Sequence, residues 1–223
     1  MREFARAALV GCGLWVLSGR GEVLRVSVEE GCVSRIAVLF AREDSIYKLM
    51  PECDVWDKTR DALSWPGGAS VIAHPPCRLW GRLRTFANVV PGEKELAVWA
   101  VDQVRKWGGV LEHPFGSTLW EFCGLPRAGK RDEFGGWTAT FPQFWLGHKA
   151  EKATHFYIVG CEPDEAPQIP MVFREPQYVV QTRKRADYRP HIPKADRERT
   201  PFEAARWLIS IATKAATNLE GCR

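Results

Sequence analysis

Short apolar runs alternate with polar segments from residue 35 onward, and this pattern predicts strands separated by helices. Ile36 to Phe40 is continuously apolar, which is typical of a strand buried on both faces. Cys53 to Trp56, Val71 to Ala73 and Val110-Leu111 predict three more strands. Glu93 to Trp107 has apolar residues at helical spacing and ends at a Gly-Gly pair, so we predict a helix there.

The second half of the chain completes the predicted sheet. Thr138 to Phe141 and His155 to Val159 predict late strands that pair antiparallel. A last helix is expected from Thr200-Pro201, an N-cap followed by proline, to about Thr217, and a short one from Asp44 to Met50. Since strands alternate with helices, we predict an α/β fold with a Rossmann-like, mostly parallel sheet and flanking helices.

The first 32 residues have a different pattern. Two arginines precede the apolar run Ala7 to Leu17, as in a signal peptide, but no clear cleavage site follows and the run is too short to span a bilayer. Alternatively, Val28 to Gly31 derives from purine-rich codons that resemble a ribosome-binding site, and Val33 is the true start. We therefore predict a poorly structured or non-native extension at 1–32 and a single catalytic domain at 33–223.

Composition and charge restrict the partners. The chain is mildly basic, with a net charge of +4. The segment Gln181 to Arg199 holds seven basic and three acidic residues, so its own net charge equals that of the whole chain. This segment is either a phosphate-binding patch or a solvated loop. The seven cysteines show no C-x-x-C spacing, so we predict free thiols, a reducing cytoplasmic location and no metal site. No membrane association and no obligate protein partner are indicated.

Two predicted strands end in proline turns that carry reactive side chains. The strand at 71–73 leads into His74-Pro75-Pro76-Cys77, and the strand at 110–111 leads into Glu112-His113-Pro114. Because the carboxyl ends of parallel strands form the ligand edge of such a sheet, we expect Cys77 and Glu112 to face one crevice. A thiolate that adds to C6 of a pyrimidine makes C5 nucleophilic, and a carboxyl held partly protonated by burial can bond N3.

Each of these residues also has a structural interpretation. Cys77 can be a small buried apolar residue, and Glu112 can form a structural salt bridge with an arginine. A nucleophilic Cys77 needs a pKa below that of free cysteine, and Arg78, Arg82 and Arg84 are the candidates to lower it. His74 and the histidine that follows Glu112 are interpreted as hydrogen-bonding loop residues without a catalytic role.

The order and spacing of four segments resemble the cytosine-C5 DNA methyltransferases, especially their compact phage-type members. The segments are Pro75-Pro76-Cys77, Glu112-His113-Pro114, Gly147 to Thr154 and Arg197 to Pro201. The resemblance extends from about Ile36 to the last helix. It implies that Cys77 attacks C6 of a cytosine in DNA, that Glu112 engages N3, and that S-adenosylmethionine is the cofactor.

The remaining predicted site residues belong to two ligands. The residues predicted for the cofactor are Phe40, Asp57 and Pro75. Phe40 lies where the family has its first motif, and Asp57 is an acid at a strand end, as in many ribose sites. For nucleic acid they are Arg78, Arg82, Lys152, Arg183 and Arg185.

The sequence departs from the family after the first strand. The family has Phe-x-Gly-x-Gly there, whereas this chain has Arg42-Glu43-Asp44-Ser45, whose side chains are expected to crowd a cofactor. Two other functions therefore stay open. One is a catalytically silent DNA-binding relative of phage or prophage origin. The other is a Rossmann-like enzyme that acts on free nucleotides through Asp44 and Asp57.

Overall fold

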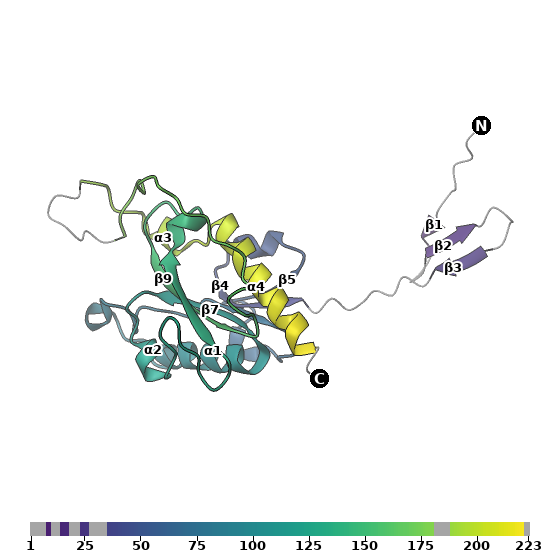
Figure 1. Cartoon of the computed structure of the whole chain (residues 1–223), viewed down its shortest axis with the longest axis horizontal. Coiled ribbons are helices and arrows are strands. Elements are labelled where there is room, and N and C mark those ends of the chain that lie inside the picture. The colour runs from purple at the N-terminus through teal and green to yellow at the C-terminus, as the bar shows by residue number, and fades with distance from the viewer. Residues whose placement is uncertain (1–7, 10–13, 18–22, 27–34, 181–187, 221–223) are drawn as a thin grey trace. The chain divides into compact units, whose positions relative to one another are not determined.

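The computed structural model describes residues 8–9, 14–17, 23–26, 35–180 and 188–220. Its internal contacts divide the chain into two units, Met1–Val33 and Ser34–Arg223. The described part of the first unit is an antiparallel sheet of three short strands in the order β1-β2-β3 (Figure 1). These strands are β1 (Ala8–Leu9), β2 (Leu14–Leu17) and β3 (Val23–Val26).

The second unit contains a six-stranded mixed sheet in the order β5-β4-β6-β7-β9-β8. Its strands are β4 (Ile36–Ala41), β5 (Cys53–Asp57), β6 (Val71–Ala73), β7 (Gly109–Pro114), β8 (Trp137–Pro142) and β9 (Ala153–Val159). The pairs among β4, β5, β6 and β7 are parallel, and β9 is antiparallel to both of its neighbours. The predicted α/β fold, a mostly parallel Rossmann-like sheet with late antiparallel strands, is confirmed.

The described residues of this unit also form four helices and four 3-10 turns, and the two last helices follow β9. The helices are α1 (Glu93–Trp107), α2 (Leu119–Phe122), α3 (Lys194–Glu198) and α4 (Phe202–Glu220). The turns are η1 (Ile46–Leu49), η2 (Ala62–Ser64), η3 (Arg84–Phe86) and η4 (Gln143–Leu146). The bounds of α1 match the prediction, whereas α4 begins after Pro201 and extends past Thr217.

The short helix predicted at 44–50 is wrong, because only the turn η1 forms there and its first residue is preceded by Ser45. Asp44 does not cap this turn. Its carboxylate instead accepts hydrogen bonds from Arg42 and Arg199, at 2.8 and 3.0 Å.

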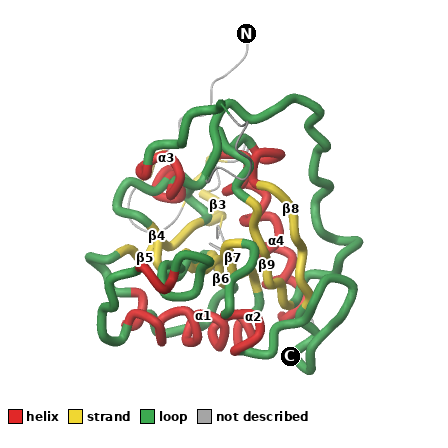
Figure 2. Tube along the Cα trace, turned by 90° about the vertical axis from the view of Figure 1, so that its left-hand side faces the viewer, coloured by secondary structure: helices red, strands yellow, loops and turns green. Residues whose placement is uncertain are grey.

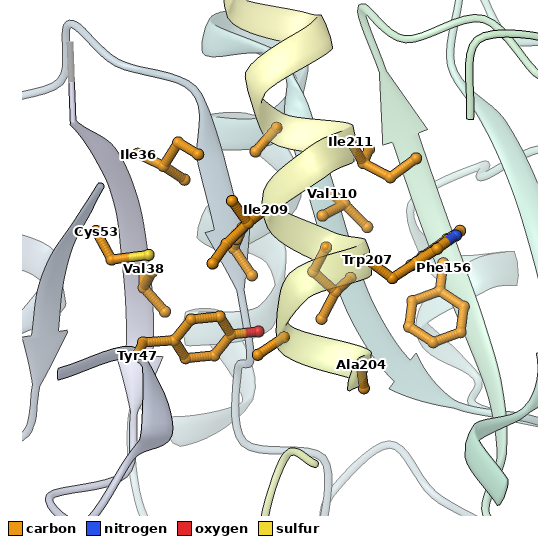
Figure 3. Close-up of a cluster of buried hydrophobic side chains, with 14 of the residues drawn as sticks. Ile36, Val38, Tyr47, Cys53, Val110, Phe156, Ala204, Trp207, Ile209 and Ile211 are labelled. Atoms are coloured by element: carbon orange, nitrogen blue, oxygen red, sulfur yellow. The ribbon is translucent and has the colours of Figure 1, made fainter. Parts of the chain in front are cut away.

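Two hydrophobic cores lie on opposite faces of the sheet because side chains alternate along β4. Ile36 and Val38 pack on the side of α4, where Trp207 meets the rings of Phe141 and Phe156 at 5.2 Å each (Figure 3). The intervening residues of β4 pack on the side of α1. Figure 2 shows α1 and α2 together along this second side. The sheet is therefore covered on both faces, as parallel sheets require.

The strand order indicates at which edge of the sheet a ligand can bind. β4 has β5 on one side and β6 on the other, so the chain reverses its direction of winding at β4, where open α/β sheets bind ligands. In the pairing of β6 with β7, Ala73 lies opposite Leu111, so His74, which follows β6, comes beside Glu112 of β7. Gly109 allows this close pairing, because a Cβ there would lie 2.0 Å from the Val71 carbonyl oxygen.

Candidate functional site

A cleft of about 1710 Å³ lies at the carboxyl ends of β4, β6 and β7. It is lined by the turn after β4, the proline turn after β6, the end of β7, the segment before β9, and α3. All described residues that the sequence predicted for the site line this one cleft: Phe40, Asp57, Pro75, Cys77, Arg78, Arg82, Glu112 and Lys152. Arg183 and Arg185 lie outside the described residues.

Glu112 is the centre of a buried hydrogen-bond network. Its Oε1 accepts bonds from Gln143 Nε2 at 2.5 Å and from Lys152 Nζ at 3.0 Å. Its Oε2 lies 2.8 Å from Nδ1 of His74. Three donors on two oxygens are the partners of a carboxylate, not of a carboxylic acid.

The charge of Glu112 follows from these contacts. Burial favours the neutral form, but the positive charge of Lys152 and the hydrogen bonds from His74 and Lys152 outweigh it and hold the pKa of Glu112 well below its usual value. The expectation of a partly protonated carboxyl is therefore wrong for the free protein. The alternative of an arginine partner is also wrong, since the ion-pair partner of this carboxylate is Lys152 and its other side-chain partners are His74 and Gln143.

Cys77 is exposed on the wall of the cleft. Its carbonyl accepts hydrogen bonds from the amides of Trp80 and Gly81, at 3.0 and 2.9 Å, which fix the turn after the prolines. The surrounding atoms of the cleft partly desolvate the thiol and raise its pKa; Glu112 raises it further, whereas Lys152 lowers it. The free protein thus holds a thiol, and the expected lowering of its pKa is not met.

Arg78 does not activate the thiol, contrary to expectation. Its guanidinium bonds both carboxylate oxygens of Glu93, at 2.7 and 2.8 Å, in the first turn of α1. The cation that acts on Cys77 is instead Lys152, which reaches the cleft from the segment before β9.

His74, Tyr47 and Gln143 are site residues that sequence reasoning missed. Nε2 of His74 lies 3.1 Å from the hydroxyl of Tyr47, which is completely buried. The sequence could have identified His74 as a site residue, because it directly follows the strand predicted beside the strand of Glu112. Tyr47 and Gln143 had none, because both lie in short turns whose position in space depends on the whole sheet.

His113 has the opposite environment to Glu112, because adjacent residues of a strand point to opposite faces. It is buried beside Trp120, and burial lowers its pKa to about 4. Neither ring nitrogen makes a hydrogen bond of ordinary geometry, although the Pro76 carbonyl lies near enough to favour the charged ring slightly. His113 is therefore neutral at physiological pH, and its ring lies near the carbonyl of Pro76 in the turn that leads to Cys77.

The last residues of β4 include a left-handed backbone conformation without glycine. Phe40 has a φ of 59° and packs edge-on against Trp99 at 5.8 Å. A left-handed residue with a Cβ costs about 1–2 kcal/mol, and such strain concentrates at functional sites. The neighbouring Arg42 and Asp44 pair with each other and with α3, through Glu198 at 3.0 Å from Arg42.

Asp57 mainly stabilises its own turn. Its Oδ1 accepts bonds from the amides of Thr59 and Arg60, at 3.0 and 3.1 Å, and its Oδ2 accepts a bond from Lys48 at 2.6 Å. The bond from Lys48 is the main reason that the pKa of Asp57 is lowered. The Asp57 side chain is itself buried, whereas Lys48 is partly exposed.

The residues predicted for a cofactor are all present in the cleft, since Phe40, Asp57 and Pro75 line it together with the Cys77 thiol. The side chains of Arg42 to Ser45, which replace the glycines of the resembled family, line it as well. Within the described part of the chain, no three His, Cys, Asp or Glu side chains are placed to hold a metal ion.

Comparisons with known proteins give no family for the chain. No protein-family model, curated protein or solved structure matches it. In the described residues, no helix is both long and apolar enough to span a membrane.

Proposed function

We propose that this cleft is an active site that adds the thiolate of Cys77 to C6 of a pyrimidine base, and that the chain is a DNA cytosine-C5 methyltransferase-like enzyme. One observation carries the proposal. A thiol after β6 and an ionised, buried carboxylate at the end of β7 line the same cleft, and one lysine acts on both. A structural salt bridge does not need an accessible cysteine beside it.

Glu112 is suited to bind the base edge of cytosine. The exocyclic N4 amino group donates hydrogen bonds, and an ionised carboxylate is its matching acceptor. When N3 gains a proton, C6 becomes more electrophilic and the sulfur of Cys77 forms a bond to it. The thiol proton is lost as N3 gains one, so the addition needs no net charge change. Lys152 stabilises the thiolate, since its charge already lowers the pKa of Cys77.

S-adenosylmethionine, when bound, supplies the electrophilic methyl group that a nucleophilic C5 accepts. Phe40, Asp57 and Pro75 would hold it on the β4 side of the cleft. The chain's own task is to hold the base with C5 toward that side while Cys77 is bonded to C6.

Double-stranded DNA reaches such a cleft only if the target base leaves the stack. The rim carries the exposed apolar side chains Leu83, Phe86 and Phe115 next to Arg82. Apolar side chains can replace the lost stacking contacts, and an arginine can bind the phosphate backbone. We therefore propose DNA as the partner, and a reducing cytoplasm as the location that keeps Cys77 a free thiol.

The test is covalent trapping on duplexes that carry 5-fluorodeoxycytidine in random sequence context, with S-adenosylmethionine present. Fluorine at C5 cannot leave as a proton does, so the Cys77 adduct persists on a denaturing gel. Cys77→Ser should abolish the adduct. Cys123→Ser is the matched control, because this half-buried thiol does not line the cleft and the adduct should survive.

The same gel decides between the candidate functions. An adduct that survives in Cys77→Ser contradicts the assignment of the nucleophile. Duplex binding by the wild-type protein without any adduct supports the catalytically silent DNA-binding protein instead.

A further inference from the structure

We propose that His74, supported by the buried hydroxyl of Tyr47, holds and delivers the proton that Glu112 passes to N3 of the base. This inference rests on the proposed function and deepens it. His74 acts through Glu112, so it is a positioning residue for the addition step.

The geometry is a continuous buried series across three elements. Tyr47 comes from η1, His74 follows β6, and Glu112 belongs to β7. The Tyr47 hydroxyl lies 3.1 Å from Nε2 of His74, and Nδ1 of His74 lies 2.8 Å from Oε2 of Glu112. Tyr47 is 1% exposed, and the side chains of His74 and Glu112 are 15% and 8% exposed. All three residues also line the cleft.

The direction of each hydrogen bond follows from the charge of Glu112. An ionised carboxylate only accepts, so Nδ1 of His74 donates to it. A hydroxyl both donates and accepts, so Tyr47 donates to Nε2 of a neutral ring and accepts from Nε2 of a charged one. Tyr47 can therefore satisfy His74 in both protonation states, which a purely structural support does not require.

The charges around His74 favour transfer toward the base. The groups that face it are Tyr47, the Glu112 carboxylate, Lys152 on the other oxygen of that carboxylate, and Cys77 on the same turn. A charged His74 and Lys152 balance Glu112 and a Cys77 thiolate. The proton lost by the exposed thiol reaches His74 through the open cleft and reaches N3 through Glu112, so the total charge of the group is constant.

A structural role makes a different prediction from a proton-transfer role. Gln143 already donates to Glu112 without titrating, which shows that a fixed donor suffices to hold the carboxylate. His74→Asn keeps a donor near the position of Nδ1 but cannot change its charge. If His74 only holds Glu112, this variant should react as the wild type does.

The experiment measures the rate of trapping by the 5-fluorodeoxycytidine duplexes as a function of pH. In His74→Asn we expect a loss on the order of a hundredfold and a profile without the wild-type decrease at high pH. In Tyr47→Phe we expect a smaller loss of rate, because His74 keeps its contact with Glu112 but loses the partner of Nε2. Tyr157→Phe is the matched control, since its buried hydroxyl donates to Asp132 outside the cleft.

A second measurement separates this inference from the proposed function. The rate at which iodoacetamide alkylates Cys77, followed by mass spectrometry of its peptide, needs no DNA. Near neutral pH we expect His74→Asn to slow this alkylation several-fold and Tyr157→Phe to leave it unchanged. A wild-type rate and pH profile in His74→Asn overturn the role of His74 even if adducts form. Slowed alkylation in a protein that traps no base shows only that His74 assists ionisation of the thiol, and it rejects the base chemistry together with proton delivery to N3.

Discussion

The ion pair between Lys152 and Glu112 offers the sharpest test of the electrostatics of the site. Lys152→Met removes the charge and keeps most of the apolar stem. Both partners are largely buried, with side-chain exposures of 18% and 8%, so water cannot replace the lost cation effectively. Removing one partner of a buried pair costs about 3–5 kcal/mol. Because His74 and Gln143 still bond the carboxylate, we expect the lower end, about 3 kcal/mol.

The assay is urea unfolding of the wild type, Lys152→Met and a matched control, Lys149→Met. Lys149 lies three residues away and pairs with Asp196 at 2.9 Å, but its side chain is 58% exposed. Exposed pairs contribute less than about 1 kcal/mol, so this control should unfold close to the wild type. Combining Lys152→Met with Glu112→Gln should recover most of the lost stability, because no unpaired charge stays buried.

The lowered pKa of Glu112 also predicts how the stability lost in Lys152→Met changes with pH. The pKa of Glu112 is lowered on folding, so its ionisation stabilises the protein above 4.5, the ordinary pKa of a glutamate side chain. This contribution is lost as the pH falls through the lowered value. The stability difference between the wild type and Lys152→Met should therefore shrink as the solution is acidified from neutral pH. The reasoning is refuted if Lys152→Met loses no more stability than Lys149→Met at neutral pH.

Three further predictions concern the fold around the site. Trp207→Ala should cost about 3–5 kcal/mol in urea unfolding, because it empties the core under α4, whereas Phe202→Ala on the exposed side of the same helix should cost little. Gly109→Ala should prevent folding, as judged by circular dichroism, because its Cβ would overlap the backbone of β6; Gly92→Ala, with open space around it, should fold. On acidification from about pH 6 to 4, the unfolded wild type takes up a proton on His113 that the native state does not, because folding lowers the pKa of His113. This uptake destabilises the wild type, so His113→Phe should lose less stability over the same range.

The parts of the fold that the sequence predicted are those with a local cause. The continuous apolar run at 36–40 and the helical spacing at 93–107 each determine an element without help from distant residues. The turn at 44–50 was mispredicted because Asp44 bonds Arg42 and Arg199 instead of capping the turn. The second of these partners follows Asp44 by 155 residues, so local sequence does not reveal it.

The candidate site divides in the same way. Its backbone placement was predictable, since two proline turns after neighbouring parallel strands must meet at one edge of the sheet. Its charge state was not. Burial alone argues for a neutral Glu112, and the opposite result depends on Lys152 and His74, whose approach is fixed only by the pairing of β9 and β6 with β7.

The raised pKa of Cys77 is consistent with a nucleophile that is activated only when the base is bound. Desolvation contributes most to that rise, the negative charges of Glu112 and Glu198 add to it, and Lys152 opposes it. In the proposed reaction the charge of Glu112 is compensated by a proton at N3. The repulsion between this carboxylate and a thiolate then weakens, while the attraction of Lys152 for the thiolate remains. Protonation of the base and ionisation of the thiol therefore favour each other, and an empty cleft keeps its cysteine in the unreactive thiol form.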